Sequence, residues 1–333
     1  LQIRLYLIIT VVAVLVFAFN LMNQTAAALL LPAAYVLTGL ADLNTAFGAW
    51  CNPVVWQMVG GLILGNVLLR TGLLRRLAFN CIALTGGTYK GIIYGFGILG
   101  VIAVIFMGSA TIPVVIFAYG ICKTLNLKPS REAAGILMAA GISTLYPLCF
   151  IFNGAYFIPA GVGAAAVGEM VSTSWPTFLT SNLPHIIGYV LVLFAITRLM
   201  KPESPWTLSK DYFKAEAKKL GRITRDKWFC IVVCIAILVF MVTAEYHGID
   251  AMWGISLIPL ALFIPGISVG REEDIAKINW SVPVFAVACI AIGNVASLLG
   301  IGSIVATAML PLVSGLSPVM FLLVVAIFMF LMN

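Results

Sequence analysis

The sequence predicts an all-α protein that crosses a membrane many times. Of its 333 residues, 62% are apolar and only 9% are charged, whereas an average soluble domain has about 25% charged residues. So little polar surface could not cover a water-soluble fold of this size, which excludes a soluble globular domain. The apolar residues also gather in runs that approach or reach the ~17–25 residues of a transmembrane helix.

Nine apolar runs are predicted to be transmembrane helices, because a helix satisfies its own backbone hydrogen bonds in lipid. The first run, which follows Arg4, could pass for a signal peptide, but further runs follow it, so we interpret it as a helix. The runs are residues 5–22, 25–41, 53–69, 91–107, 133–152, 183–199, 228–244, 251–269 and 281–302.

Basic residues lie mainly in the gaps between these runs. The net charge is +7, but the basic residues form no cluster on a water-facing surface, so nucleic acid is not an expected partner. They concentrate in residues 70–76, 123–131 and 198–227. Cytoplasmic loops of membrane proteins carry such an excess. We therefore predict a multi-pass protein of the cell (inner) membrane with these basic loops on the cytoplasmic side.

The residue types that carry most enzyme chemistry are sparse. The seven cysteines have no metal-ligand spacing and there are only two histidines, so we predict no bound metal other than the sodium ion discussed below. The sequence has neither a His-Glu-x-x-His motif nor a facing pair of membrane aspartates. An intramembrane enzyme is therefore not expected.

A re-entrant hairpin is predicted between Lys90 and Lys123. The apolar arm after the polar break at residues 108–111 has eleven residues, 112–122. As a helix it spans about 17 Å, which is short of a hydrocarbon core of about 30 Å. Basic residues at both ends and a small polar break between them favour a hairpin with its tip near mid-membrane. The alternative is a pair of ordinary tilted helices with a Gly-Ser kink.

An internal repeat is indicated by Gly-Asn-Val at residues 65–67 and again at 293–295. Five predicted crossings separate the copies, so the second is inverted, and inverted repeats are typical of secondary transporters. In each copy one glycine follows the asparagine by six residues and another by twenty-one: Gly72 and Gly87, then Gly300 and Gly315.

Both ends of the chain look truncated. The apolar run 319–332 continues up to Asn333 without a break, where the repeat predicts that a second hairpin tip begins. At the other end, counting crossings back from the basic loops places Arg4 on the wrong face. We therefore expect one further crossing upstream.

These residues together resemble the divalent anion:sodium symporters, a family that carries dicarboxylates, citrate or sulfate. The resemblance implies a scaffold that forms a homodimer in the lipid bilayer and a transport domain that moves as an elevator. It rests on Asn52–Trp56, on Thr71–Ala78 leading to Gly86-Gly87, on the hairpin through Pro113, on Trp175 with Leu183-Pro184, on Leu220-Gly221, and on Ile278–Trp280.

The same resemblance implies the site residues. The family's hairpin tip usually contains Ser-Asn-Thr, and here the aligned Gly108-Ser109-Ala110-Thr111 keeps both hydroxyls but has Ala110 in place of the amide. The family's broken helix ends in Pro-Pro-Asn, of which only Asn153 matches. The predicted substrate- and sodium-binding residues are Gly108, Ser109, Ala110, Thr111, Asn153, Gly154 and Asn333.

Sodium is the coupling ion that these residue types favour. Carbonyls freed at a helix break, with Ser, Thr and Asn oxygens, can hold a hard cation, and the N-termini of restarting half-helices suit an anion. Proton relays instead use intramembrane carboxylates or histidines, and Asp42, Glu169, Glu245 and Asp250 all fall near predicted helix ends. For Ser143 and Thr144, ion binding and plain helix packing stay open.

We therefore predict sodium-coupled symport of a small divalent anion, with sodium as a transported ion. The alternatives are a sodium/proton antiporter or oxyanion efflux permease of the same superfamily, and a non-transporting membrane subunit. The expected organisation is scaffold helices in residues 1–85, the hairpin and broken helix of the transport domain in 86–182, a transmembrane helix in 183–199, a cytoplasmic amphipathic linker in 200–227, second-repeat scaffold helices in 228–315, and the start of a second hairpin in 316–333.

Overall fold

The computed structural model confirms the all-α prediction. It describes residues 1–107, 111–125, 127–151, 175–202, 210–304, 307, 315–317, 319–324 and 327, and every regular element within these ranges is a helix. Among them, four helical stretches are long and apolar enough to cross a membrane. A fifth crossing is possible if Trp175–Ser181 and Leu183–Leu199, which are bent by 60°, form one span. Many large apolar side chains of these helices are exposed, as expected for a surface in contact with lipid.

The chain divides into two compact units. The first contains residues 1–51 and the chain from Val284 onward, and the second contains residues 52–151 and 175–283 of the described structure. The helices of the first unit are α1 (Gln2–Ala18), α2 (Gln24–Leu37), α3 (Leu43–Phe47), the 3₁₀ helix η1 (Gly48–Cys51) and most of α17 (Ser281–Leu298).

Two stacked tyrosines hold the first unit together. The rings of Tyr6 on α1 and Tyr35 on α2 lie 5.7 Å apart. The Tyr6 hydroxyl donates to the Ile292 carbonyl of α17 (3.2 Å), and the Tyr35 hydroxyl is 2.7 Å from that of Thr10. Because buried hydroxyls need partners, these contacts fix how the three helices pack.

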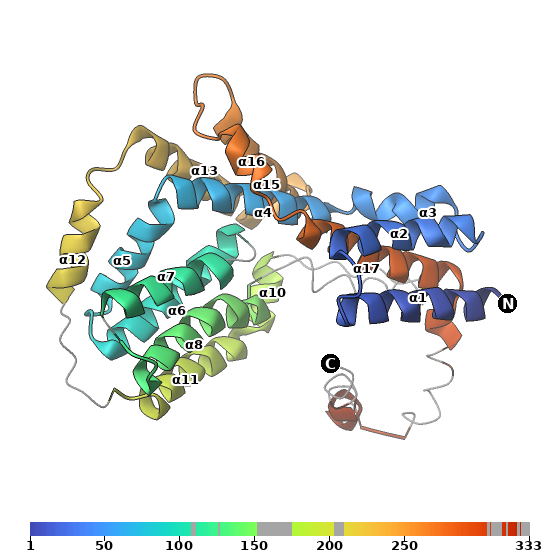
Figure 1. Ribbon diagram of the computed structural model, residues 1–333, viewed down its shortest axis with the longest axis horizontal. Helices are drawn as coiled ribbons and strands as arrows, with labels where there is room; N and C mark the ends of the chain where they lie inside the picture. Colours follow the sequence, from blue (N-terminus) through green and yellow to red (C-terminus); the bar gives the residue numbers. More distant parts are fainter. Residues whose placement is uncertain are drawn as a thin grey trace. The chain divides into compact units, whose positions relative to one another are not determined.

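The second unit is a larger bundle in which α8 lies among α6, α7 and α11 (Figure 1). Helix α5 packs on α6, and α15 packs on α4. The elements are α4 (Pro53–Arg70), α5 (Leu73–Leu84), α6 (Tyr89–Met107), α7 (Thr111–Thr124), α8 (Arg131–Leu145), η2 (Tyr146–Cys149), α10 (Trp175–Ser181), α11 (Leu183–Leu199), α12 (Lys210–Lys219), α13 (Arg225–Val242), α14 (Ala244–His247), α15 (Met252–Leu257), η3 (Ile258–Phe263) and α16 (Glu272–Ala276).

Glycines let these helices approach closely. A Cβ atom added at Gly60 on α4 would overlap the Ile255 carbonyl of α15, and one at Gly100 on α6 would overlap the Ser143 carbonyl of α8. Small residues at such crossings are typical of membrane helix bundles, where van der Waals contact supplies much of the association energy. The glycines therefore fix both crossings.

The predicted span at residues 251–269 is wrong as a single helix. Helix α15 passes into η3 at Ile258, and the helical stretch ends at Phe263. Pro259 lacks the N–H that would continue the α-helical hydrogen bonds, and Gly266 adopts a φ of 95° in the turn that follows. The resulting Met252–Phe263 stretch is shorter than a membrane-spanning helix.

Residues from separate basic loops contact one another in the second unit. Arg76, after α4, donates to the Gly221 carbonyl after α12 (2.8 Å). Arg70 forms an ion pair with Asp274 on α16 (2.9 Å). Residues of two predicted basic loops, 70–76 and 198–227, therefore contact each other, and Arg70 also contacts α16, as expected for segments on one side of a membrane. Which side they face stays a prediction.

The amphipathic segment at residues 210–225 packs on protein rather than presenting a free apolar face. Helix α12 contacts α5, and its Phe213 side chain is 1% exposed. The Phe213 ring lies 6.5 Å from that of Phe79. The segment predicted as an amphipathic linker thus contributes Phe213 to the core of this unit.

The two Gly-Asn-Val copies make reciprocal contacts. The Asn66 side chain on α4 donates to the Asp274 carbonyl on α16 (2.8 Å), and the Asn294 side chain on α17 donates to the Thr45 carbonyl on α3 (3.4 Å). Each asparagine thus binds the short helix that precedes the other copy's long helix. Gly72 and Gly300, which follow those long helices, both have a left-handed φ, of 73° and 67°. The second pair of glycines does not match in this way, because Gly87 has a left-handed φ and Gly315 does not. These contacts support the repeat.

Candidate functional site

Helix α6 ends beside the middle of α4. A Cβ atom at Gly61 would lie 2.7 Å from the Met107 carbonyl oxygen, and one at Gly65 would lie 2.6 Å from the Met107 side chain. Gly61 is the ninth of the 18 residues of α4, a helix about 27 Å long. The end of α6 therefore lies beside the middle of α4, which forms part of the candidate membrane span Leu43–Arg70.

Helix α7 is too short to cross a membrane comfortably. It begins at Thr111 and has 14 residues, with Lys123 in its last turn. That is about 21 Å of helix against a hydrocarbon core of about 30 Å. This length agrees with the short second arm expected for a hairpin, and the re-entrant path itself stays a prediction.

The start of α7 contacts the end of α8 through two hydroxyl groups. Thr144 donates to the Thr111 hydroxyl oxygen, with 2.9 Å between the two atoms. Thr144 is 1% exposed and lies one residue before α8 ends at Leu145. There the chain passes into the 3₁₀ turn η2 at Tyr146, with Pro147 in its first turn, because a proline cannot extend the α-helical hydrogen bonds. The N-terminal end of α7 and the C-terminal end of α8 therefore meet at Thr111 and Thr144.

The structure separates the roles of the neighbouring hydroxyls Ser143 and Thr144. Ser143 is fully buried and donates to the Ala140 carbonyl of its own helix (2.9 Å), so its polar group is satisfied locally and it serves packing. The Thr144 hydroxyl also lies 2.9 Å from the Gly141 carbonyl of its own helix, but in addition it contacts Thr111 on another helix at the candidate site. The sequence left both residues undecided, because a hydroxyl in an apolar run has the same local signal in either role.

Of the seven predicted site residues, the structure describes Thr111 alone. It places Thr111 against Thr144, which sequence reasoning had not assigned to the site. The other six, Gly108, Ser109, Ala110, Asn153, Gly154 and Asn333, lie outside the described residues.

Gln57 on α4 is a buried amide that sequence reasoning did not single out. It is one of the few amides within the apolar run 53–69 and is 6% exposed. A polar side chain within an apolar run is the sequence signal that could have identified it, since buried polar groups in membrane spans tend to be functional.

The chemistry available for a cation is that of neutral oxygens. Within the part of the chain that the structure describes, no three His, Cys, Asp or Glu side chains lie close enough to hold a metal ion together. Hydroxyls, amide oxygens and carbonyls at helix ends suit a hard monovalent cation instead. These are the atoms that the residues around Thr111 and the end of α6 present.

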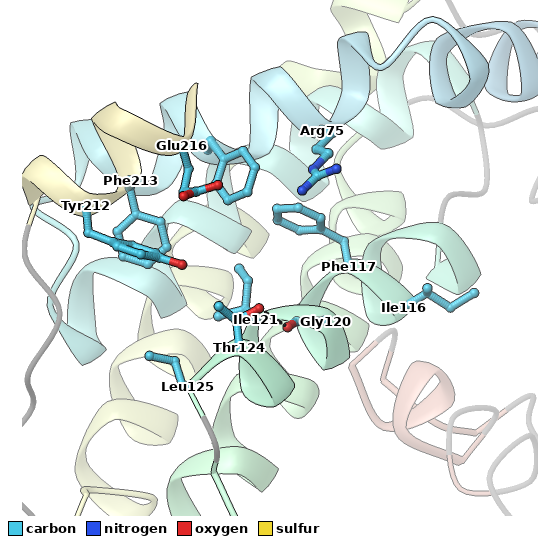
Figure 2. Close-up of a pocket in the computed structure, with 11 residues that line it drawn as sticks. Arg75, Ile116, Phe117, Gly120, Ile121, Thr124, Leu125, Tyr212, Phe213 and Glu216 are labelled. Atoms are coloured by element: carbon cyan, nitrogen blue, oxygen red, sulfur yellow. Dashed lines mark hydrogen bonds between the residues drawn. The ribbon is translucent and has the colours of Figure 1, made fainter. Parts of the chain in front are cut away.

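A separate cavity of about 350 Å³ lies among α5, α7 and α12. Figure 2 shows Arg75 and Phe117 facing Glu216 and Tyr212 across it. The Arg75 guanidinium lies over the Phe79 ring, 5.5 Å from its centre. None of the residues at the meeting of α6, α7 and α8 lines this cavity, so it is distinct from the candidate site.

The comparisons with known proteins agree with this architecture. The model of the citrate transporter family matches residues 13–333. The chain is 24% identical over 242 residues to the chloroplastic dicarboxylate transporter 2.1 of Arabidopsis thaliana, covering 68% of this chain and 43% of that protein. It is equally similar to the chloroplastic dicarboxylate transporter 2 of Spinacia oleracea, with 24% identity over 243 residues and the same coverage of both chains.

An uncharacterized transporter of Schizosaccharomyces pombe is 23% identical over 278 residues, which is 81% of this chain and 30% of that protein. The chain thus spans less than half the length of these curated relatives. Because the family model covers nearly all of the sequence, and because the fold is a helical bundle with a short arm and meeting helix ends, the chain belongs to the citrate transporter family of multi-pass membrane proteins.

Proposed function

We propose that the protein containing this chain is a secondary active transporter that couples sodium entry to the uptake of a small divalent anion. Dicarboxylates and citrate are the favoured substrates, with sulfate as a third possibility to test. The observation that carries the proposal is the contact between Thr111 and Thr144, where the start of α7 meets the end of α8. The names of the relatives support an organic anion.

The helix ends at this place have opposite polarity. The C-terminal end of α6 at Met107 carries partial negative charge and carbonyl groups without intrahelical partners, which attract a cation. The N-terminal end of α7 at Thr111 carries partial positive charge and free N–H groups, which attract an anion. Two ends so close in sequence can bind a cation and an anion together without a charged side chain.

Sodium coupling is favoured over proton coupling by the positions of the acidic residues. Among the described residues, Asp42 caps α3, Glu245 lies in the short helix α14, and Asp250 lies in the turn before α15. Asp274 is held by Arg70 at the end of α4. None of these carboxylates stands alone in the middle of a span, where a proton relay would need one.

The rest of the proposal concerns assembly and movement. We propose an elevator-type mechanism in a homodimer, with scaffold helices in residues 1–85 and 228–315 and transport-domain elements in 86–182. We place the basic loops on the cytoplasmic side of the cell membrane. The shortness of α7 and the meeting of helix ends in the first repeat support a transport domain of this kind.

The test uses the full-length protein in proteoliposomes. Uptake of labelled succinate, citrate and sulfate is measured with an inward sodium gradient, with potassium in place of sodium, and with a proton gradient. We expect uptake of at least one organic anion that needs sodium. Uptake driven equally by protons alone would refute sodium coupling, and no uptake under any gradient would indicate a non-transporting subunit.

Thr144→Val tests the site itself. This change removes the hydroxyl contact to Thr111 and keeps the volume, so we expect transport efficiency to fall about tenfold, as for the loss of one hydrogen bond. The matched control is Thr197→Val on α11, because Thr197 is 2% exposed and, in the part of the chain that the structure describes, donates within its own helix to the Phe194 carbonyl. Equal losses in both variants would remove Thr144 from the site.

A further inference from the structure

The cavity among α5, α7 and α12 contains a positive charge that its surroundings do not neutralise. Arg75 on α5 lies in the cavity wall, and in the described part of the chain its guanidinium forms no ion pair. The acidic side chain of the same wall, Glu216 on α12, is already paired with Lys219 of its own helix. These three side chains together leave a net positive charge, which favours an anionic ligand.

The Arg75 side chain is held in a position suited to an oxyanion. Its guanidinium carbon lies 5.5 Å from the centre of the Phe79 ring. Stacking on a ring occupies a face of the guanidinium, whereas the N–H groups lie in its plane and stay available. Two of these N–H groups can bind two oxygens of one phosphate, the geometry in which arginine recognises that group.

The rest of the cavity wall is mainly apolar. Three phenylalanines from the three helices form an aromatic cluster, in which the Phe79 ring lies 5.2 Å from that of Phe117 on α7 and 6.5 Å from that of Phe213 on α12. Ile116 and Ile121 add aliphatic surface from α7. A soluble inorganic anion would leave this surface uncovered, whereas an amphiphile with an anionic group would cover it.

An exposed apolar stripe leads from the cavity along α7. Ile112 and Ile116 are four residues apart and so share a face of the helix, and they are 72% and 63% exposed. Gly120, four residues further on, lines the cavity as Ile116 does. Exposed apolar surface of this kind is typical of a membrane interaction site. The stripe is therefore a path along which an acyl chain can leave the cavity.

We propose that this cavity binds an anionic phospholipid, with the phosphate group at Arg75, the glycerol region against the aromatic cluster and an acyl chain on the stripe of α7. Arg75 belongs to the basic loop 70–76, which is predicted to be cytoplasmic. The cytoplasmic leaflet is rich in anionic lipids, and basic pockets between helices on that side bind lipid headgroups. A lipid bound here contacts α5, α7 and α12 together, so it stabilises their arrangement. The inference does not depend on the coupling ion or the substrate proposed above.

The experiment uses the full-length protein, stripped of lipid in a neutral detergent, and follows its melting temperature as phosphatidylglycerol is added. Phosphatidylcholine is the zwitterionic comparison, and inorganic phosphate and glycerol phosphate test for a soluble anion. Arg75→Gln removes the charge and keeps most of the length. Its matched control is Arg198→Gln on α11, because Arg198 also lies over a phenylalanine ring, that of Phe194, at 4.9 Å, but is not among the residues that line the cavity.

Gly120→Leu tests the cavity without changing a charge. A Cβ atom at Gly120 would meet no atom within 4 Å, so a larger side chain can be placed there and take up cavity space. The matched control is Gly141→Leu on α8, because a Cβ at Gly141 also meets no atom within 4 Å and that residue does not line the cavity. This pair keeps the proposal testable if Arg75→Gln does not fold.

We expect phosphatidylglycerol to raise the melting temperature of the wild type at concentrations at which phosphatidylcholine has little effect. Arg75→Gln should need about tenfold more phosphatidylglycerol for the half-maximal rise, as for the loss of a charged hydrogen-bonded contact. Gly120→Leu should lose most of the rise. Arg198→Gln and Gly141→Leu should respond as the wild type does.

An equal response to phosphatidylglycerol in the wild type, Arg75→Gln and Gly120→Leu would overturn this inference, because the lipid would then bind elsewhere. An equal rise with phosphatidylcholine would also overturn it, since the charge of Arg75 would have no role. The same rise with inorganic phosphate or glycerol phosphate alone would show a site for a soluble anion in place of a lipid. None of these results bears on the proposed transport function, which the uptake experiment tests separately.

Discussion

Replacing Arg70 by alanine should leave the Asp274 carboxylate buried without its partner. Arg70 Nε lies 2.9 Å and 3.1 Å from the two carboxylate oxygens, and its Nη2 lies 2.9 Å from one of them. The Asp274 side chain is 2% exposed and that of Arg70 is 20% exposed. The Asp274 carboxylate also accepts from the Arg271 backbone N–H (2.9 Å). This is a bidentate pair in which only the arginine reaches solvent.

The size of the effect follows from that burial. Removing one partner of a buried ion pair costs about 3–5 kcal/mol, because the remaining charge stays desolvated and unpaired. Asp274→Asn should cost less, about 1–3 kcal/mol, because Arg70 can still donate to the amide oxygen and can turn its charge to water. In the double variant the unpaired carboxylate is gone, so its cost should be well below the sum of the single changes.

Acidity should weaken the same interaction. Burial alone would raise the pKa of Asp274, but the hydrogen bonds from Arg70 and Arg271 hold it below its ordinary value of 3.8. A carboxyl group with a lowered folded-state pKa stabilises the protein above its unfolded pKa, and this contribution is lost as the pH falls through the folded pKa. The pair should therefore contribute fully at pH 7 and lose its contribution below about pH 4.

The assay is equilibrium unfolding in mixed micelles, read by tryptophan fluorescence, for the wild type, Arg70→Ala, Asp274→Asn and the double variant at pH 7 and at a pH below about 4. The reasoning requires a coupling energy of about 2 kcal/mol or more at pH 7. Additive costs, or a loss below about 1 kcal/mol for Arg70→Ala, would show that the pair is solvated like a surface salt bridge.

Two further changes test the packing around the candidate site and the linker. Gly100→Ala should destabilise the protein by about 1–3 kcal/mol, because its Cβ would overlap the Ser143 carbonyl. The control Gly141→Ala, whose Cβ would meet no atom within 4 Å, should be neutral or stabilising. Equal melting temperatures for these two variants would refute the close crossing of α6 and α8. Phe213→Ala should detach α12 from α5, with about 3–5 kcal/mol lost from that contact. Limited trypsin digestion at Lys218 would then be faster than in the exposed control Asp211→Ala, and equal digestion rates would count against the docking of α12.

The local pattern of the sequence predicted many of the helices. Apolar runs match α1, α2, α4, α6, α11 and α13 to within a few residues, because a helix in lipid is determined by a continuous apolar stretch. Residues of two of the three predicted basic loops, 70–76 and 198–227, contact each other, and the common membrane side of all three stays a prediction. At residues 251–269 hydropathy was misleading, since it does not register the proline that ends the helix early.

What the sequence alone determined is the membrane class, the positions of most helices and the repeated Gly-Asn-Val signature, all of which depend on residues close together along the chain. The tertiary structure decided which polar groups meet. Thr144 reaches Thr111 across 33 positions, Asn66 reaches Asp274 across 208, and Ser143, next in the chain, stays within its own helix. A hydroxyl or amide has the same local pattern whether it packs or binds, because its role is set by the partner that folding brings to it.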